Sequence, residues 1–116
     1  MAANLHIKRI YEPASRDDGA RILVDRIWPR GVSKNAADLT LWLKEIAPST
    51  ALRVWFHHDP SQWAEFRRRY RKELDANPGA VMLLRGHLKE GRVTLLYAAR
   101  DEAHNHARVL ADYIKA

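Results

Sequence analysis

Residues 92–99, RVTLLYAA, form a nearly continuous apolar run. A strand of this kind is covered on both faces, as in a mostly parallel sheet with helices packed against it. A second run, RILVD at residues 21–25, is rich in apolar and β-branched residues, and LHIKRI at residues 5–10 alternates as a half-buried strand does. Parallel pairing of the first two runs requires a crossover, which helical patterns between them supply. The sequence therefore predicts an α/β fold.

Five segments carry the apolar stripe or the start signal of a helix. The expected inward positions are Leu39, Trp42, Leu43 and Ile46; Leu52, Trp55 and Phe56; Trp63, Phe66, Tyr70 and Leu74; Val81, Leu84 and Leu88; and Ala103, Ala107, Leu110, Ala111 and Ile114. With 116 residues, the chain is long enough for one core and too short for two ordinary ones. We expect a single compact domain over residues 1–116, with a small, mostly parallel sheet flanked by helices.

Three helix starts have recognisable capping residues. Ser49 is placed to cap a short helix that follows Pro48. Asp59 is the expected N-cap of the next helix, with Pro60 at the first helical position and Gln62 at the capping-box position. The pair 77–78, Asn-Pro, repeats this signal, and the last helix is expected to begin near residue 101.

Composition limits the classes of function. The chain has no cysteine, which excludes disulfides, thiolate nucleophiles and cysteine-ligated zinc, and fits a reducing compartment. No segment has the length of an apolar membrane span, and residues 1–13 lack the apolar core of a signal peptide, so we expect a cytoplasmic protein. The net charge is +6, with 14 arginines and 6 lysines. This excess indicates anionic partners or, equally, a bias of the coding sequence.

The stretch VDRIWPRG, residues 24–31, places charged and aromatic side chains directly after a predicted strand. Parallel strands end at the same edge of a sheet, so AARDEAHNH, residues 98–106, is expected beside it. The two segments predict a site for a small anionic, phosphate- or nucleotide-like ligand. The expected ligand-binding residues are Arg26, Trp28, Arg30, Arg100, Asp101 and Asn105, with His106 and Asp25 as the candidate catalytic residues.

The same residues also fit a purely structural network. In that case Asp25 pairs with an arginine, Asp101 caps the last helix and Trp28 fills the core. If a ligand site is present, backbone donors of a helix beginning near Asp101 favour an anion, and an enzymatic role for the site remains open. No glycine-rich phosphate loop, nucleophile elbow or dinucleotide fingerprint is present, so no cofactor is expected.

Three longer motifs resemble the domain-of-unknown-function 488 family, specifically its YeaO-like branch. They are ILVDRIWPRG, IAPSTALRVWFHHDPSQWAEFRRRY and VTLLYAARDEAHNHARVLADY, and they cover nearly the whole chain. The resemblance implies a compact α/β domain and no established activity. Asp25, Arg26 and Pro29 match the aspartate-arginine-proline pattern of the wider family. Where its other branch has a cysteine and then a cysteine-histidine-arginine group, this chain has Tyr97 and then Asn105, His106 and Ala107.

Two other features suggest rival functions. The helix face Arg67–Lys72, within FRRRYRK, is basic and makes a nucleic-acid-binding or regulatory module the alternative function. Its aromatic residues belong to the apolar stripe, however, so a solvated charged face explains it as well. His57, His58 and Asp59 contain metal-ligating side chains, but Asp59 is better explained as a helix cap, and no metal site is predicted.

Overall fold

The computed structural model describes residues 4–57 and 59–116. Four strands form one sheet: β1 (Leu5–Arg9), β2 (Ala20–Leu23), β3 (Leu41–Trp42) and β4 (Val93–Tyr97). Their order is β1-β4-β2-β3, and every neighbouring pair is parallel. The predicted pairing of the RILVD and VTLLYAA runs is confirmed, with Ile22 opposite Leu95. The α/β prediction is likewise confirmed.

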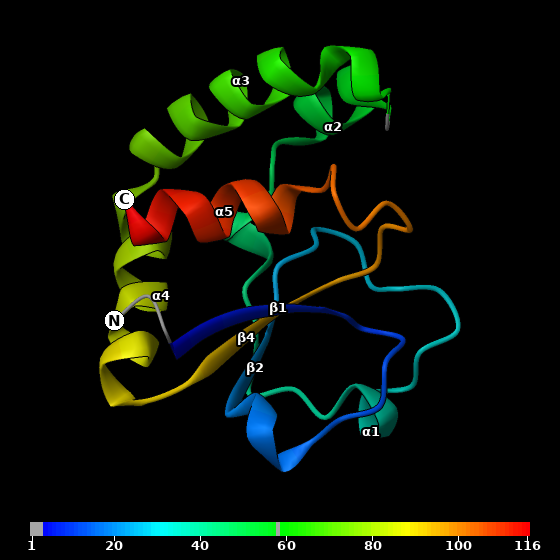
Figure 1. Cartoon of the computed structure of the whole chain (residues 1–116), viewed down its shortest axis with the longest axis vertical. Helices are drawn as coiled ribbons and strands as arrows, with labels where there is room; N and C mark the ends of the chain where they lie inside the picture. Colours follow the sequence, from blue (N-terminus) through cyan, green and yellow to red (C-terminus); the bar gives the residue numbers. More distant parts are fainter. Residues whose placement is uncertain (1–3, 58) are drawn as a thin grey trace.

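Helices cover one face of this sheet, as Figure 1 shows. They are α2 (Thr50–Phe56), α3 (Trp63–Asp75), α4 (Pro78–Glu90) and α5 (His106–Lys115). Helix α5 packs on β1 and β4, and α3 packs on α5. The other face is covered by the connection between β2 and β3, which includes the short helix α1 (Lys34–Ala37).

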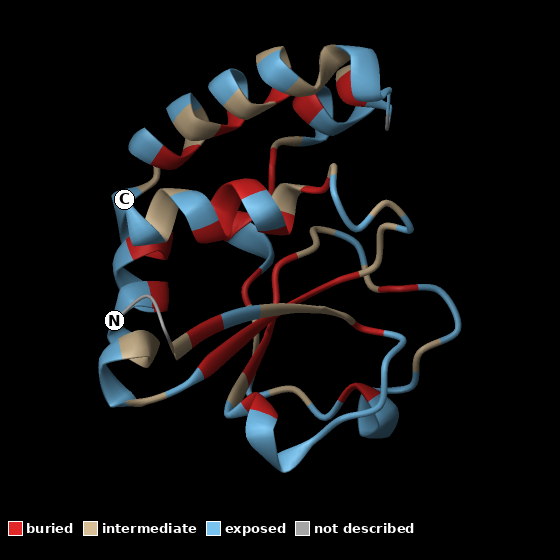
Figure 2. Cartoon of the chain, viewed as in Figure 1, coloured by how far each residue is buried: buried red, intermediate tan, exposed pale blue. Residues whose placement is uncertain are grey.

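The two central strands are buried on both faces because their side chains alternate between two apolar clusters (Figure 2). Val93 and Leu95 point into the larger cluster beneath the helices, together with Ile22. Leu23 and Leu96 point into the smaller cluster on the other face, against which Trp28 and Trp42 pack. The apolar run at 92–99 was therefore a correct signal of a strand covered from both sides.

The helix expected around Leu39, Trp42, Leu43 and Ile46 is wrong. Helix α1 ends after Ala37, where Asp38 takes a left-handed conformation with φ 48°. The next residues form β3, whose Leu41 and Trp42 pair with Ile22 and Leu23, and then a 3₁₀ turn, η3 (Lys44–Ile46). Pairing with β2 outweighs the helical spacing of the apolar residues, since it satisfies backbone groups along the sheet edge.

The three helix starts at Ser49, Asp59 and Asn77 lie where the sequence predicts them. The Ser49 hydroxyl accepts from the backbone N–H of Leu52. Asp59 caps a 3₁₀ turn, η4 (Pro60–Gln62), which continues into α3. The predicted capping box is wrong, because the Asp59 N–H donates to the carbonyl of Phe56 and the Gln62 amide contacts the Asp59 carboxylate instead. His58 lies outside the described residues.

The last helix begins later than predicted. Asp101 caps a turn, accepting from the N–H groups of Ala103 and His104. Helix α5 starts at His106, and its N-cap is Asn105, whose side chain accepts from the N–H of Arg108. Asn105 is buried and Ala103 is exposed, so the polar cap rather than the alanine stripe decides the start of the helix.

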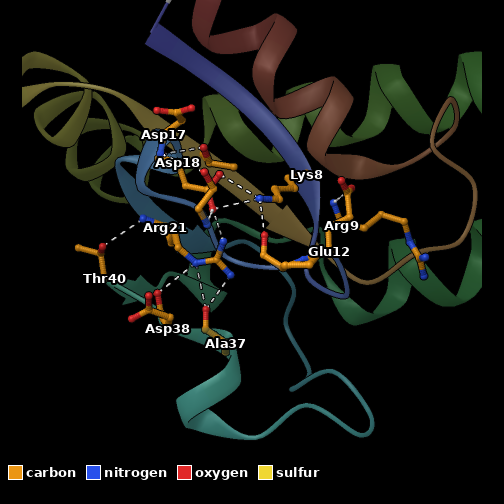
Figure 3. Close-up of polar contacts among 12 residues, drawn as sticks. Lys8, Arg9, Glu12, Asp17, Asp18, Arg21, Ala37, Asp38 and Thr40 are labelled. Atoms are coloured by element: carbon orange, nitrogen blue, oxygen red, sulfur yellow. Dashed lines mark hydrogen bonds and ion pairs between the residues drawn. The ribbon is translucent and has the colours of Figure 1, made fainter.

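A buried polar network lies at the end of the sheet where β2 and β4 begin, opposite the end that holds the predicted ligand site (Figure 3). Arg21 forms an ion pair with Asp18 and donates to the carbonyls of Ala37 and Asp38. Lys8 donates to Asp18 at 3.1 Å. Asp18 belongs to a 3₁₀ turn, η2 (Arg16–Asp18). This network links β1, the turn before β2 and the end of α1.

Gly19 allows the turn before β2 to approach β4 closely. Its φ is +64°, and a Cβ atom at this position would lie 2.3 Å from the carbonyl oxygen of Arg92. Only glycine fits here, because any side chain would overlap the neighbouring backbone.

Candidate functional site

A cleft of about 560 Å³ lies where β2 and β4 end. The loops after these two strands reach the same end of the sheet, beneath α2 (Figure 1). The cleft is lined by Asp25, Arg26, Ile27, Ala47, Pro48, Arg53, Phe56, Phe66, Ala98, Ala99, Arg100, Asp101, Asn105 and His106. Six of the eight predicted site residues are thus brought together: Asp25, Arg26, Arg100, Asp101, Asn105 and His106.

The buried end of the cleft contains Asp25 and His106. The Nε2 atom of His106 lies 2.9 Å from Asp25 Oδ1 and 3.0 Å from the carbonyl oxygen of Val24. Asp25 Oδ2 accepts from the backbone N–H of Ala98 at 3.0 Å, which links the ends of β2 and β4. The side chains of Asp25 and His106 are 15% and 16% exposed. Asp25 and the carbonyl of Val24 are positioned to hold the His106 imidazole in one orientation.

Arg26 is fixed by the backbone rather than by a carboxylate. Its Nε and Nη2 atoms donate to the carbonyls of Pro48 and Ala47, each at 3.1 Å. Within the described part of the chain, Nη1 has no partner. The alternative in which Asp25 is neutralised by a directly paired arginine is therefore not what the structure contains. Arg26 also lines the cleft.

Tyr70 of α3 lies behind this end of the cleft. Its hydroxyl donates to the carbonyl of Ile46 at 2.7 Å, and its ring centre is 6.5 Å from that of His106. Burial raises the pKa of Tyr70 well above the usual tyrosine value, the charges of Glu73 and Asp25 act in the same direction, and Arg26 opposes them. Tyr70 therefore stays a neutral hydrogen-bond donor.

Two arginines stand at the exposed rim of the cleft. Arg53 comes from α2 and Arg100 from the loop after β4, and both are exposed. Neither side chain makes an ion pair with a residue described in the structure. Arg53 was not predicted. The sequence places it in the short helix capped by Ser49, but it does not show that this helix contributes to the cleft.

Aromatic rings form one wall of the cleft. Phe56 and Phe66 are stacked with ring centres 4.3 Å apart, and Trp63 stacks on Phe66 at 5.7 Å. His104, from the loop before α5, contacts Trp63 edge to face at 5.2 Å. Asp101 holds this loop, since its carboxylate also contacts His104 Nδ1 at 3.0 Å. The backbone N–H of His104, together with the other hydrogen bonds to the carboxylate, lowers the pKa of Asp101.

The structure does not bring Trp28 and Arg30 to the cleft. Trp28 packs on the smaller apolar cluster, its indole N–H donates to Val32, and its ring contacts Trp42 edge to face at 5.3 Å. Arg30 is exposed, and its carbonyl accepts from the hydroxyl of Tyr11. The chain bends at Arg26 and Ile27 and turns again at Arg30 and Gly31, which leads both side chains away from the strand ends.

The basic face Arg67–Lys72 of α3 is partly neutralised within the helix. Glu65 pairs with both Arg68 and Arg69, and these hydrogen bonds lower the pKa of Glu65 to about 2. The guanidinium of Arg69 also lies 4.2 Å from the ring centre of Trp55. These contacts reduce the charge that this face offers to a nucleic acid.

The described residues contain neither a metal cluster nor a membrane-spanning helix. Among residues 4–57 and 59–116, no group of three or more histidine, aspartate or glutamate side chains is arranged to hold a metal ion. Within the same residues, every helix is too short or too polar to cross a membrane.

Comparison with known proteins identifies the family. A family model described as "Inactive DUF488-N3 subclade" matches residues 4–116. The chain belongs to this family. It is 45% identical to the uncharacterized protein YeaO of Escherichia coli over 97% of this chain and 98% of the relative. It is 42% identical to the uncharacterized protein Rv3073c of Mycobacterium tuberculosis, over 95% and 92% respectively. No solved structure gives a significant match.

The family resemblance seen in the sequence is therefore confirmed. Two segments of the motifs that carry it, Asp25–Ile27 and Ala98–His106, contribute to the cleft, as does the connection from Ala47 to Phe56. Asn105 and His106 are the N-cap and first residue of α5.

Proposed function

We propose that this protein binds a small anionic ligand, phosphate- or nucleotide-like, in the cleft at the ends of β2 and β4. The observation that carries the proposal is the pair Arg53 and Arg100. They approach the rim from two separate elements, and neither has an acidic partner among the described residues. A guanidinium can give two parallel hydrogen bonds to a phosphate or carboxylate, so two such groups are suited to an anion.

The rest of the cleft supports an anion attached to an apolar body. Phe56, Phe66 and Pro48 offer a largely apolar wall, and a volume of about 560 Å³ lies within the range of small-molecule sites. The N-terminal end of α5 lies at the same cleft and adds a partial positive charge.

We propose binding without turnover. The sequence has no cysteine, so a thiolate reaction at this position is excluded. The description of the matching subclade as inactive agrees with a protein that binds a ligand without converting it. His106 then serves to bind the ligand, and Asp25 serves to orient the His106 ring.

The proposal is tested by thermal unfolding with inorganic phosphate, ribose 5-phosphate and nucleoside mono- and triphosphates. A ligand at about one hundred times its Kd stabilises the folded state by about 2.7 kcal/mol, which raises Tm by several degrees. The increase should be smaller in Arg53→Gln and Arg100→Gln. The matched control is Arg16→Gln, an exposed arginine outside the cleft, which should respond as the parent does. If no compound raises Tm, or if all three variants respond as the parent does, the proposal is wrong.

A further inference from the structure

One nitrogen of the His106 imidazole, Nε2, faces two hydrogen-bond acceptors. Its Nε2 atom faces the carbonyl oxygen of Val24 at 3.0 Å and Asp25 Oδ1 at 2.9 Å. A carbonyl oxygen cannot donate, and a carboxylate accepts. Nε2 therefore carries the proton, and in the neutral ring the lone pair lies on Nδ1. The fold fixes the tautomer of His106.

The Nδ1 atom is left for a ligand. It has no partner within the described residues, and the side chain lines the cleft while being 16% exposed. Asp25 cannot take this role, because Oδ2 accepts from Ala98 and Oδ1 is enclosed, without a well-aligned donor. The negative charge of Asp25 beside the Nε2 proton reinforces the orientation of the ring.

The neighbouring polar side chains are already paired. The Asn105 amide donates to the carbonyl of Asp101 and accepts from the N–H of Arg108. The hydroxyl of Tyr70 is directed to Ile46. Among the described side chains at the buried end of the cleft, His106 Nδ1 is an acceptor and Nη1 of Arg26 a donor for which the structure shows no partner. A ring amide, in which an N–H stands beside a C=O, provides the complementary donor and acceptor.

We infer that the cleft binds a nucleotide whose base carries a ring amide, as in uracil or guanine, with the amide N–H donated to His106 Nδ1. This inference rests on the proposed function and specifies its ligand. The phosphate lies at Arg53 and Arg100, the base beside the wall formed by Phe56 and Phe66, and the amide carbonyl accepts from Arg26. A site built to accept an N–H discriminates strongly against an analogue that lacks it, since the acceptor is then left unpaired.

The first test measures the tautomer and needs no ligand. In ¹⁵N-labelled protein at a pH where His106 is neutral, NMR should show a protonated Nε2 and an unprotonated Nδ1. His106→Phe assigns the signals. A neutral His106 protonated at Nδ1 would overturn the inference and leave the proposed anion site unaffected.

The second test compares matched ligands by titration calorimetry. Uridine 5′-monophosphate is compared with its N3-methyl derivative, guanosine 5′-monophosphate with its N1-methyl derivative, and both pairs with ribose 5-phosphate. At least one parent nucleotide should bind about tenfold or more tightly than its methylated counterpart and than ribose 5-phosphate. His106→Phe should abolish this preference, while His87→Phe, a change in the separate helix α4, should keep it.

The outcomes separate the two proposals. Binding of phosphate compounds with no preference for the ring amide would refute the inference while the anion site stands. Failure of every phosphate compound to bind would refute both. The ligand comparison in the unmodified protein decides these cases even if the His106 variant does not fold.

Discussion

Replacing Arg21 by methionine should strongly destabilise the fold. The Arg21 side chain is only 4% exposed, and the Asp18 side chain with which it pairs is 8% exposed (Figure 3). Methionine has a similar length and keeps apolar contacts, but it removes the ion pair and the donors to the carbonyls of Ala37 and Asp38. The change therefore tests the polar network rather than the volume of the core.

The magnitude follows from which partners remain. Removing one member of a buried ion pair costs about 3–5 kcal/mol. Asp18 retains Lys8 and the N–H of Ser15, which places the expected loss near the lower value, at about 3 kcal/mol. A domain of this size has a stability of about 5–15 kcal/mol, so the loss is a large fraction of the total.

Urea unfolding at pH 7 measures the effect as a lower midpoint with an unchanged slope. A second measurement near pH 3 tests the electrostatic origin. Burial tends to raise the pKa of Asp18, but hydrogen bonds from Ser15, Lys8 and Arg21 outweigh it and the pKa is lowered. A lowered folded-state pKa gives stability that is present above the ordinary aspartate value and is lost as the pH falls through the folded value. The difference between parent and variant should therefore shrink in acid.

Arg16→Met is the matched control, because Arg16 is exposed and its removal should change stability by no more than about 0.5 kcal/mol. A loss in Arg21→Met below about 1 kcal/mol, or a loss of equal size at both pH values, would refute the reasoning.

Three further variants test other elements. Asn105→Ala should cost about 1–2 kcal/mol in urea unfolding through loss of the α5 cap, while Asn105→Ser, which keeps a capping oxygen, should cost less; equal losses would contradict the capping role. Arg26→Met should cost about 2 kcal/mol, since two carbonyls lose a charged donor, and Arg30→Met should be neutral in both stability and phosphate binding. Charge reversal at Arg68 and Arg69 should leave any DNA or RNA affinity and its salt dependence unchanged; a reduced salt slope would support the nucleic-acid alternative.

Local signals in the sequence were enough for the strands and most helix starts. The short apolar run ending at Tyr97 favours a strand buried on two faces, and the structure has one there. Ser49 and Asp59 indicate helix starts because their side chains accept hydrogen bonds from backbone N–H groups two or three residues later. These interactions lie within one turn of the chain, so the sequence contains all of their participants.

Tertiary contacts explain the failures. Leu41 and Trp42 have helical spacing with their neighbours, but pairing with β2 makes them a strand, and nothing local shows that this edge is open. Asp101 and Asn105 are both good caps, and burial of Asn105 selects the second.

The candidate site was predictable where it depends on sheet topology and hidden where it depends on helix packing. Parallel strands place Asp25 and Arg100 at one edge, which the sequence indicated. Arg53 and Phe56 reach the cleft only because α2 folds over that edge. Trp28 and Arg30 lie outside it, because the chain turns after Ile27. The roles of the residues that do line the cleft remain predictions.

The central position of β4 has a consequence for synthesis of the protein on the ribosome. Leu5 and Ala20 both pair with Val93, so the first two strands cannot join each other and must wait until β4 has been translated. At about 5–20 residues per second, the nascent chain spends several seconds with β1 and β2 exposed. Pairing between such distant segments is also intrinsically slow. Chains truncated before Val93 should therefore remain unfolded and be preferred substrates of chaperones and proteases, while the complete sheet forms only once β4 is available.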